Sequence, residues 1–377
     1  MRFGIVQEAY FPPGVSLQQR YLDMVEEAVQ AEKSGFDFYC TSEQHFGFSD
    51  AFLVDRAGKH HTQKSGTVSA PETFLPYIAA RTERIRLRPT SVVLLSFNHP
   101  VRVAEWIATL DVLTDGRAEL GTARSNNLST IQAFGVDPKD TKALWQESLE
   151  LLVKAFTDDP FVHEGTWWSF PSPRTLTPKP IQKPHPPIFV SASSVATHRG
   201  AAELGIGAMT GGSIVGWQYV EEAAAAYCEA IGDAEPLPGS TVNHSLGFFA
   251  TRVNCAETQE AARAAIEKTA LTFIEINIGP GGRYEQLAPT SPDYAYLGSI
   301  REMQEHMDDL DYIMEKTPYV LFGTPDFLID KFRRLESMGY TELLLGIEGM
   351  SHEANLRAIE TLGTHVLPAF AREPAAL

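Results

Sequence analysis

The stretch Phe36-Asp37-Phe38-Tyr39-Cys40-Thr41 is followed at once by Ser42-Glu43-Gln44-His45-Phe46. Its first six residues have the composition of a short buried strand, and the next five bring groups that accept, donate or carry protons. The preceding segment, 21–35, has apolar residues at helical spacing and ends on a glycine suited to a left-handed helix cap. In a barrel or doubly wound α/β fold, chemistry lies at the carboxyl ends of strands. We therefore expect Glu43, Gln44 and His45 to face a pocket.

The same alternation of strand and helix continues along the chain. Eight strands are expected, at residues 3–6, 36–41, 85–95, 118–121, 188–192, 206–209, 245–253 and 342–347. The helices are expected at residues 21–35, 71–82, 100–113, 141–156, 197–204, 218–230, 258–269, 325–338 and 353–367. Because β-α-β connections are right-handed and make strands parallel, eight such units predict a closed (β/α)8 TIM barrel. A doubly wound sheet is the alternative, disfavoured because no GxGxxG turn follows the first strand.

The length and composition indicate a large globular α/β protein. The chain has 377 residues, 44% of them hydrophobic and 21% charged, which suffices to bury a large core. We favour a single domain over 1–377 with insertions after its strands. Loop composition at a length that compact connections rarely reach marks three lid insertions, at 47–69, 157–187 and 275–318.

Charge and cysteine content exclude several classes of partner. The 31 basic and 48 acidic residues give a formal net charge of −17, which repels nucleic acid and anionic membrane surfaces. The three cysteines, Cys40, Cys228 and Cys255, show no metal-binding spacing, and an odd number argues against a disulfide framework. We expect no signal peptide, because residues 1–6 already have the composition of a strand, and no apolar run reaches the roughly 18 residues needed to span a bilayer. We expect a cytoplasmic enzyme with no metal site.

Two other strand ends offer groups suited to an anion. Arg124 lies among small polar residues after one strand, and its guanidinium presents a fork of donors that matches a phosphate. A structural ion pair at the rim of the sheet is an alternative of about equal weight. The segment Ser193-Ser194-Val195-Ala196-Thr197 places hydroxyls at the start of a helix. Helix N-termini bind phosphate, although an ordinary N-cap is the common alternative. His99, just before Pro100, is a further acid/base candidate near the same barrel mouth. A histidine at the start of a helix is more often a capping or packing residue.

Several short motifs, in order along the chain, resemble the bacterial luciferase-like family of flavin-dependent monooxygenases, which are (β/α)8 barrels with insertions. They are Met1-Arg2-Phe3-Gly4 with Tyr10, Pro12 and Pro13, then Gly35-Phe36-Asp37, Glu43-Gln44-His45-Phe46, His99-Pro100-Val101-Arg102, Asp115-Gly116-Arg117, Phe134-Gly135 and Phe322-Gly323-Thr324-Pro325. Each motif is weak singly, but their succession over nearly the whole chain is specific. The start is similar to the α subunit of luciferase.

The resemblance implies roles for the strand-end residues. Arg124 would hold the phosphate of FMN, with Ser193, Ser194, Val195 and Thr197 at the other strand end. The family often has a non-prolyl cis peptide under the flavin ring, which would fall at about Ser91-Val92. Ala123 stands where luciferase has a reactive cysteine, so a thiol role is absent.

The main departure from luciferase is Gln44, which stands where luciferase has its catalytic histidine. An amide cannot act as a general base. The proton-handling role then falls to His45, Glu43 or His99, and aldehyde oxidation with light emission is disfavoured.

The activity that the resemblance implies is that of a two-component monooxygenase. FMNH2 from a separate flavin reductase would react with O2 to a C4a-peroxyflavin, which oxygenates a small organic substrate, and the enzyme would be a homodimer. Two alternatives stay open: hydride transfer with the deazaflavin F420 on the same fold, and a non-catalytic flavin-binding protein.

Overall fold

The computed structural model describes residues 1–11, 14–46, 64–65, 68–125, 127–280, 282, 284–285, 298 and 300–371. Within these residues, nine strands form one parallel sheet in the order β5-β3-β1-β15-β12-β11-β10-β7-β6. Their bounds are β1 Arg2–Gln7, β3 Phe38–Thr41, β5 Arg86–Pro89, β6 Val92–Val93, β7 Leu120–Ala123, β10 Ile188–Ala192, β11 Gly207–Thr210, β12 Leu246–Ala250 and β15 Glu342–Gly346. The two end strands, β5 and β6, follow each other in the chain, and Leu87 of β5 also bridges to Ala118 just before β7. The sheet therefore closes on itself, and the predicted TIM barrel is confirmed.

The expected strand at 85–95 differs from the observed structure. It is divided into β5 and β6, and the peptide bond between Thr90 and Ser91 at the break is cis. The cis bond expected at about Ser91-Val92 is thus one bond earlier.

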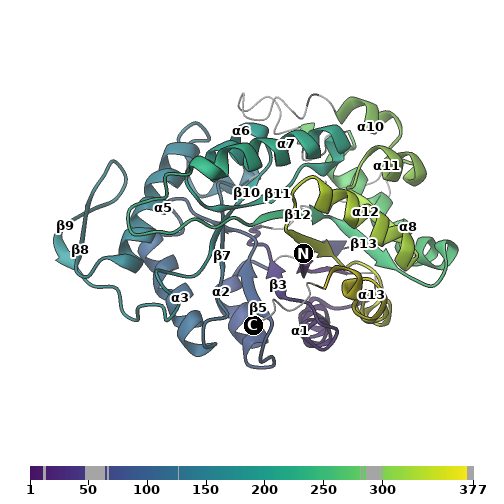
Figure 1. Ribbon diagram of the computed structural model, residues 1–377, viewed down its shortest axis with the longest axis horizontal. Helices are drawn as coiled ribbons and strands as arrows, with labels where there is room; N and C mark the ends of the chain where they lie inside the picture. Colours follow the sequence, from purple (N-terminus) through teal and green to yellow (C-terminus); the bar gives the residue numbers. More distant parts are fainter. Residues whose placement is uncertain are drawn as a thin grey trace.

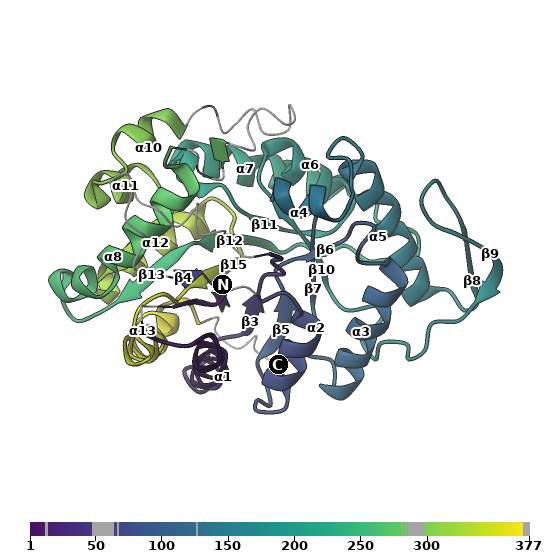
Figure 2. The ribbon, with the colours of Figure 1, turned by 180° about the vertical axis from the view of Figure 1, so that it is seen from behind.

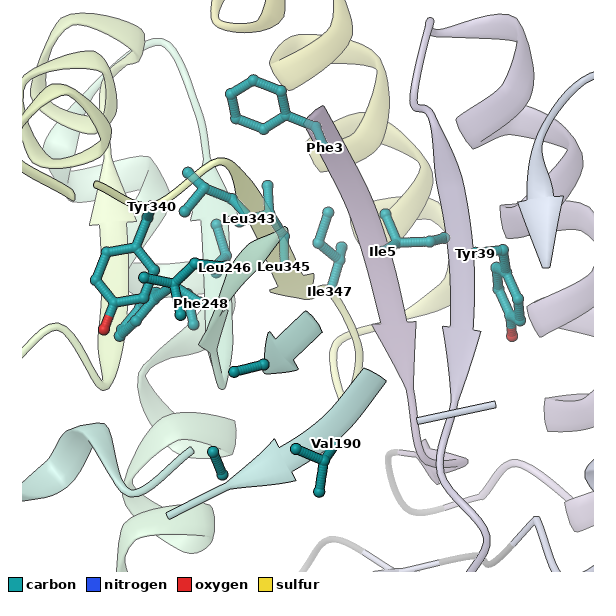
Figure 3. Packing of buried hydrophobic residues seen from close by; sticks show 14 of the residues in the cluster. Phe3, Ile5, Tyr39, Val190, Leu246, Phe248, Tyr340, Leu343, Leu345 and Ile347 are labelled. Carbon is teal, nitrogen blue, oxygen red and sulfur yellow. The ribbon is translucent and has the colours of Figure 1, made fainter. Parts of the chain in front are cut away.

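Helices surround the barrel on its outside. The longer ones are α1 Leu17–Lys33, α2 Pro71–Ala79, α3 Pro100–Leu113, α5 Thr141–Thr157, α6 Val195–Glu203, α7 Trp217–Ala230, α8 Gln259–Ile278, α12 Pro325–Ser337 and α13 His352–His365. In both views, α6 and α7 cover one side, and α1 and α13 cover the opposite side (Figures 1 and 2). Outward-facing strand residues such as Ile5 and Leu345 are fully buried in the layer between strands and helices, part of which Figure 3 shows. This follows from the period of two along each strand.

Some described elements were not expected. They are α4 Leu128–Ala133, α10 Arg301–Glu305, α11 Leu310–Lys316, the pair β13 Arg252–Cys255 and β14 Val320–Gly323, and the pair β2 Tyr10–Phe11 and β4 Lys64–Ser65. The stretch 275–318, expected to be irregular, contains the end of α8 followed by α10 and α11. The expected strand at 245–253 continues past β12 into β13, which pairs with β14 outside the barrel sheet. Of the predicted lids, residues 47–63, 66–67, 281, 283, 286–297 and 299 lie outside the described residues.

The middle insertion, 157–187, carries a β-hairpin, as its turn composition indicated. The strands β8 Phe161–Glu164 and β9 Ser169–Arg174 pair antiparallel, and the hairpin projects away from the barrel in both views (Figures 1 and 2). Three backbone N–H groups of its turn, those of residues 166–168, donate to the Glu147 carboxylate of α5 at 2.9–3.1 Å. Among the described helices, none has the length and apolarity needed to cross a bilayer.

An ionic cluster fills the N-terminal end of the barrel interior. Arg88 is fully buried and lies between the rings of Phe38 and Phe189, with 4.4 and 3.6 Å from its guanidinium carbon to the ring centroids. Its Nη2 pairs with Glu119 at 2.5 Å and Glu342 at 2.9 Å. This end of the barrel is therefore packed with side chains, and the accessible chemistry is left to the C-terminal end.

Candidate active site

A pocket opens at the carboxyl ends of the barrel strands. It encloses about 910 Å³, its open mouth included. Eight of the residues predicted from the sequence line it: Glu43, Gln44, His45, Ser91, Arg124, Ser193, Ser194 and Thr197. The other three, Val92, His99 and Val195, lie outside its lining, and Val93 lines it in place of Val92. Strand ends far apart in the sequence thus meet at one site, as the topology of a barrel requires.

Arg124 and the start of α6 both line the pocket. Ser194 is the N-cap of this helix: its Oγ accepts from the Thr197 backbone N–H at 3.2 Å and lies 2.8 Å from the Thr197 hydroxyl. The Thr130 hydroxyl also lines the pocket and is buried without a hydrogen-bond partner among the described residues. A buried hydroxyl without a partner is costly. A guanidinium, an unpaired hydroxyl and a helix N-terminus together suit a phosphate.

A neutral histidine holds the start of α6 in place. Burial lowers the pKa of His198 to about 4, so the ring carries one hydrogen near neutral pH. Its Nδ1–H donates to the Ser194 carbonyl and its Nε2 accepts from the Thr210 hydroxyl, both at 2.8 Å. The sequence analysis missed His198. Its position one helical turn after the N-cap Ser194 could have indicated a contact with the Ser194 carbonyl.

Both carboxylate oxygens of Glu43 accept hydrogen bonds from other groups of the protein. Its Oε2 accepts from the Val93 backbone N–H at 2.9 Å, and its Oε1 accepts from the Asn98 side-chain amide at 2.7 Å. The same Oε1 lies 2.6 Å from Nε2 of His45. Glu43 therefore ties the end of β3 to the segment after β6 and orients His45 at the pocket wall.

Gln44 orients a carboxylate that the sequence analysis missed. Its Nε2 donates to Oε1 of Glu8 at 2.8 Å. The Ser42 hydroxyl lies 2.8 Å from the same oxygen and 2.7 Å from the Thr90 carbonyl oxygen. A serine hydroxyl has one hydrogen, so it can donate to Glu8 when that carboxylate is ionised. When Glu8 is protonated, it can donate to Ser42, which then donates to Thr90.

The hydrogen bonds around Glu8 thus accommodate either protonation state. Glu8 follows β1 directly, and the strand-end rule that selected Glu43 would have selected it too.

A second lobe of about 920 Å³ shares Glu8, Ser42, Thr90, Ser191 and Ser193 with the pocket. It extends across the barrel mouth toward α8. Its further lining consists of Met209, Thr210, Gly211, Gly212, Ser213, Phe249, Thr251, Phe273, Asn277, Tyr284, Tyr319 and Leu344. The site therefore has a polar lobe beside Arg124 and a second lobe with aromatic walls.

His99 lies beneath the hairpin instead of in the pocket. It is the N-cap of α3, where its Nδ1 accepts from the Val101 backbone N–H at 3.2 Å. Its ring packs edge-on against Trp168 and Phe170, with centroids 4.5 and 5.7 Å away. Burial lowers the pKa of His99. The capping alternative fits this geometry.

Replacing His99 by alanine tests this assignment. We expect the free energy of unfolding to fall by about 0.5–2 kcal/mol, because the helix loses its cap. Flavin binding should not change. Urea denaturation measures the first quantity and fluorescence titration the second; a weakened flavin complex would return His99 to the site.

The comparisons with known proteins agree with this architecture. Residues 1–342 match the family model for luciferase-like monooxygenases. A 4-hydroxyprotoasukamycin monooxygenase of Streptomyces nodosus subsp. asukaensis is 28% identical over 341 residues, which cover 86% of this chain and 83% of that protein. The oxygenase component of a flavin-dependent trigonelline monooxygenase of Acinetobacter baylyi is 26% identical over 342 residues, covering 84% and 87%.

The solved structures include a similar monooxygenase. The crystal structure of RslO1 from Streptomyces bottropensis superposes with a TM-score of 0.75 at 25% identity, covering 98% of this chain and 100% of that one. The barrel, the strand-end pocket and the family match over most of the chain lead to one conclusion. This chain belongs to the luciferase-like monooxygenase family.

Proposed function

We propose that the protein is the oxygenase component of a two-component monooxygenase, which uses FMNH2 from a separate reductase and O2 to oxygenate a small organic substrate. The observation that carries this proposal is that one pocket is lined by Arg124, by the N-terminus of α6 and by the Thr130 hydroxyl, which has no hydrogen-bond partner among the described residues. Its donors suit the dianionic phosphate of FMN. The relatives, which are monooxygenases, support the oxygenation.

The residues present fit a flavin. Arg124, Ser194 and Thr197 would hold the phosphate, with Ser193 and Val195 beside them. Ser91 and Ser191, whose hydroxyls lie 2.5 Å apart, would form the floor under the ring. When bound, the flavin supplies the redox chemistry with oxygen.

The protein's own tasks are then to bind, to orient and to exclude water. Glu43 positions His45 at the pocket wall, and Gln44 positions Glu8. We propose His45 and Glu8 as the groups that can hold or move a proton there. The rings of Phe97 and Phe134 stack on each other with centroids 4.2 Å apart and pack edge-on against His45, at 5.7 and 5.1 Å.

The test is an anaerobic titration with FMNH2, followed by rapid mixing with oxygen-saturated buffer. We expect saturable binding and a long-lived flavin species that is spectrally distinct from free oxidised FMN. If neither appears, the proposal is wrong. Titrating F420 in parallel separates the hydride-transfer alternative, and flavin binding without turnover of any substrate would indicate the non-catalytic alternative.

Replacing Thr130 by valine tests the proposed phosphate site, because it should weaken FMN binding without destabilising the free protein. FMN binding should weaken by about 0.5–1.5 kcal/mol, because one neutral hydrogen bond to phosphate is lost. The free protein should unfold at an equal or higher temperature, because a buried unpaired hydroxyl is removed. Thermal denaturation with and without FMN measures both. Lower stability of the free protein would show that the hydroxyl has a structural partner.

The homodimer is proposed by analogy with the family. Light scattering of the purified protein tests it, and a monomeric mass would exclude it.

A further inference from the structure

We propose that the second lobe binds its substrate through an N–H or O–H group donated to Oε2 of Glu8, and so selects uncharged or cationic compounds with a planar apolar body over carboxylates. This inference rests on the proposed function for the identity of the lobe as the substrate site. It concerns binding alone and requires no chemical step.

The two oxygens of Glu8 differ in their surroundings. Oε1 is occupied by Gln44 and Ser42, each at 2.8 Å. Oε2 makes no hydrogen bond to any described residue. It is also not one of the fully buried atoms that lack a partner, so it is accessible from the site. Glu8 lines both lobes of the site. One oxygen is therefore fixed by the protein, and the other is available to a ligand.

The backbone of Glu8 is held equally firmly. Its N–H donates to Oε2 of Glu348 at 2.8 Å, and the Tyr10 N–H donates to the same atom at 3.1 Å. Ala9, between them, has a φ of 63°, a left-handed conformation that a non-glycine residue adopts at a cost. The turn after β1 thus aims the Glu8 side chain into the barrel mouth.

Charged groups surround Glu348, whose carboxylate accepts a hydrogen bond from the Glu8 backbone. Burial, and to a smaller extent the nearby Glu8, raise the pKa of Glu348 to about 7 against the opposing effect of Arg252 and Arg20. The charged groups packed around Glu348 include Arg20 and Glu27 of α1, and His352 of α13 contacts Glu27.

The lining of the second lobe complements a negative Glu8. Among its described lining residues, Glu8 is the one charged side chain. The lining also includes aromatic rings, among them Phe273 and Tyr319, which stack with centroids 5.9 Å apart. In this lobe a carboxylate substrate would meet a like charge and no cation among the described lining residues. A cation or a neutral donor would meet an acceptor beside flat apolar walls.

Three isosteric probes test the preference: benzamidine, benzamide and benzoate, which are cationic, neutral and anionic. Binding to the protein is measured by ligand-detected NMR and calorimetry, both without flavin and with oxidised FMN. We expect benzamidine to bind most tightly and benzoate most weakly. In Glu8→Gln, benzamidine should lose about tenfold or more in affinity and come level with benzamide.

Two further variants sharpen the experiment. Glu222→Gln removes one negative charge from the exposed face of α7 and should keep the wild-type ranking. Glu8→Asp keeps the charge, so it should keep the cation preference at reduced strength even if Glu8→Gln fails to fold.

Three results would overturn the proposal: equal or tighter binding of benzoate, an unchanged preference in folded Glu8→Gln, or no saturable binding of benzamidine. The ranking measured without flavin is independent of flavin binding. Failure of the proposed function and failure of this inference are thus distinguishable.

Discussion

FMNH2 is expected to bind about 10- to 150-fold more weakly when Arg124 is replaced by alanine, a loss of about 1.5–3 kcal/mol. Arg124 lines the pocket beside the N-terminus of α6, where the phosphate of FMN is proposed to lie. A guanidinium can make two parallel charge-assisted hydrogen bonds to a phosphate, and alanine makes none. The helix N-terminus and the hydroxyls of Ser194 and Thr197 would remain, so binding is weakened and not abolished.

Anaerobic fluorescence titration measures the dissociation constant in each variant. Arg124→Lys keeps the charge but loses the fork of donors, so we expect an intermediate constant. Arg102→Ala is the matched control, because this arginine pairs with Glu105 on the exposed surface of α3. An unchanged constant in Arg124→Ala would place the phosphate elsewhere and remove the main support for the flavin site.

The barrel and much of the site were predictable from the sequence for the same reason. Helical and strand periodicities alternate along the chain, and parallel strands bring their carboxyl ends to one edge. That topology alone predicts that 42–46, Arg124 and Ser194 meet, although more than 140 residues separate the first from the last. Eight of the predicted residues line the pocket, and none of them required knowledge of side-chain contacts.

Other features depended on contacts that no local pattern specifies. Gln44 was read as the loss of a base, but its amide orients Glu8, a pairing across two strands that only the closed barrel creates. His99 was placed at the barrel mouth, and the hairpin covers it with Trp168. The helices α10 and α11 are short, at five and seven residues, too short for a clear amphipathic period.

The Glu43 interactions show why residue type alone cannot assign a role. A carboxylate and a histidine in sequence suggest an acid/base pair. In the folded chain, three groups occupy the two oxygens of Glu43, and its contact with His45 is one of them. Glu8 differs from Glu43, because only its Oε1 accepts hydrogen bonds from described residues and its Oε2 is open to the site.

Replacing Glu119 by glutamine is expected to lower the free energy of unfolding by about 3–5 kcal/mol. Glu119 is fully buried and accepts from Arg2, Arg86 and Arg88. Glutamine has nearly the same shape, so no cavity forms, but the fully buried Arg88 loses the nearer of its two carboxylates. Urea denaturation measures the loss. Glu105→Gln, which breaks an exposed pair with Arg102, is the control and should cost about 1 kcal/mol or less.

The pH dependence distinguishes this ionic effect from a packing defect. Burial raises the pKa of Glu119, but Arg88, Arg2 and Arg86 outweigh it and hold the pKa well below the ordinary value of 4.5. Since the folded pKa is depressed, the stabilisation is present above pH 4.5 and is lost as the pH falls toward the folded value. The stability difference between wild type and Glu119→Gln should therefore be constant near neutral pH and shrink in acid. A difference that stays constant down to the lowest pH at which the protein folds would mean that the ionised carboxylate contributes nothing, and that the barrel interior depends on shape alone.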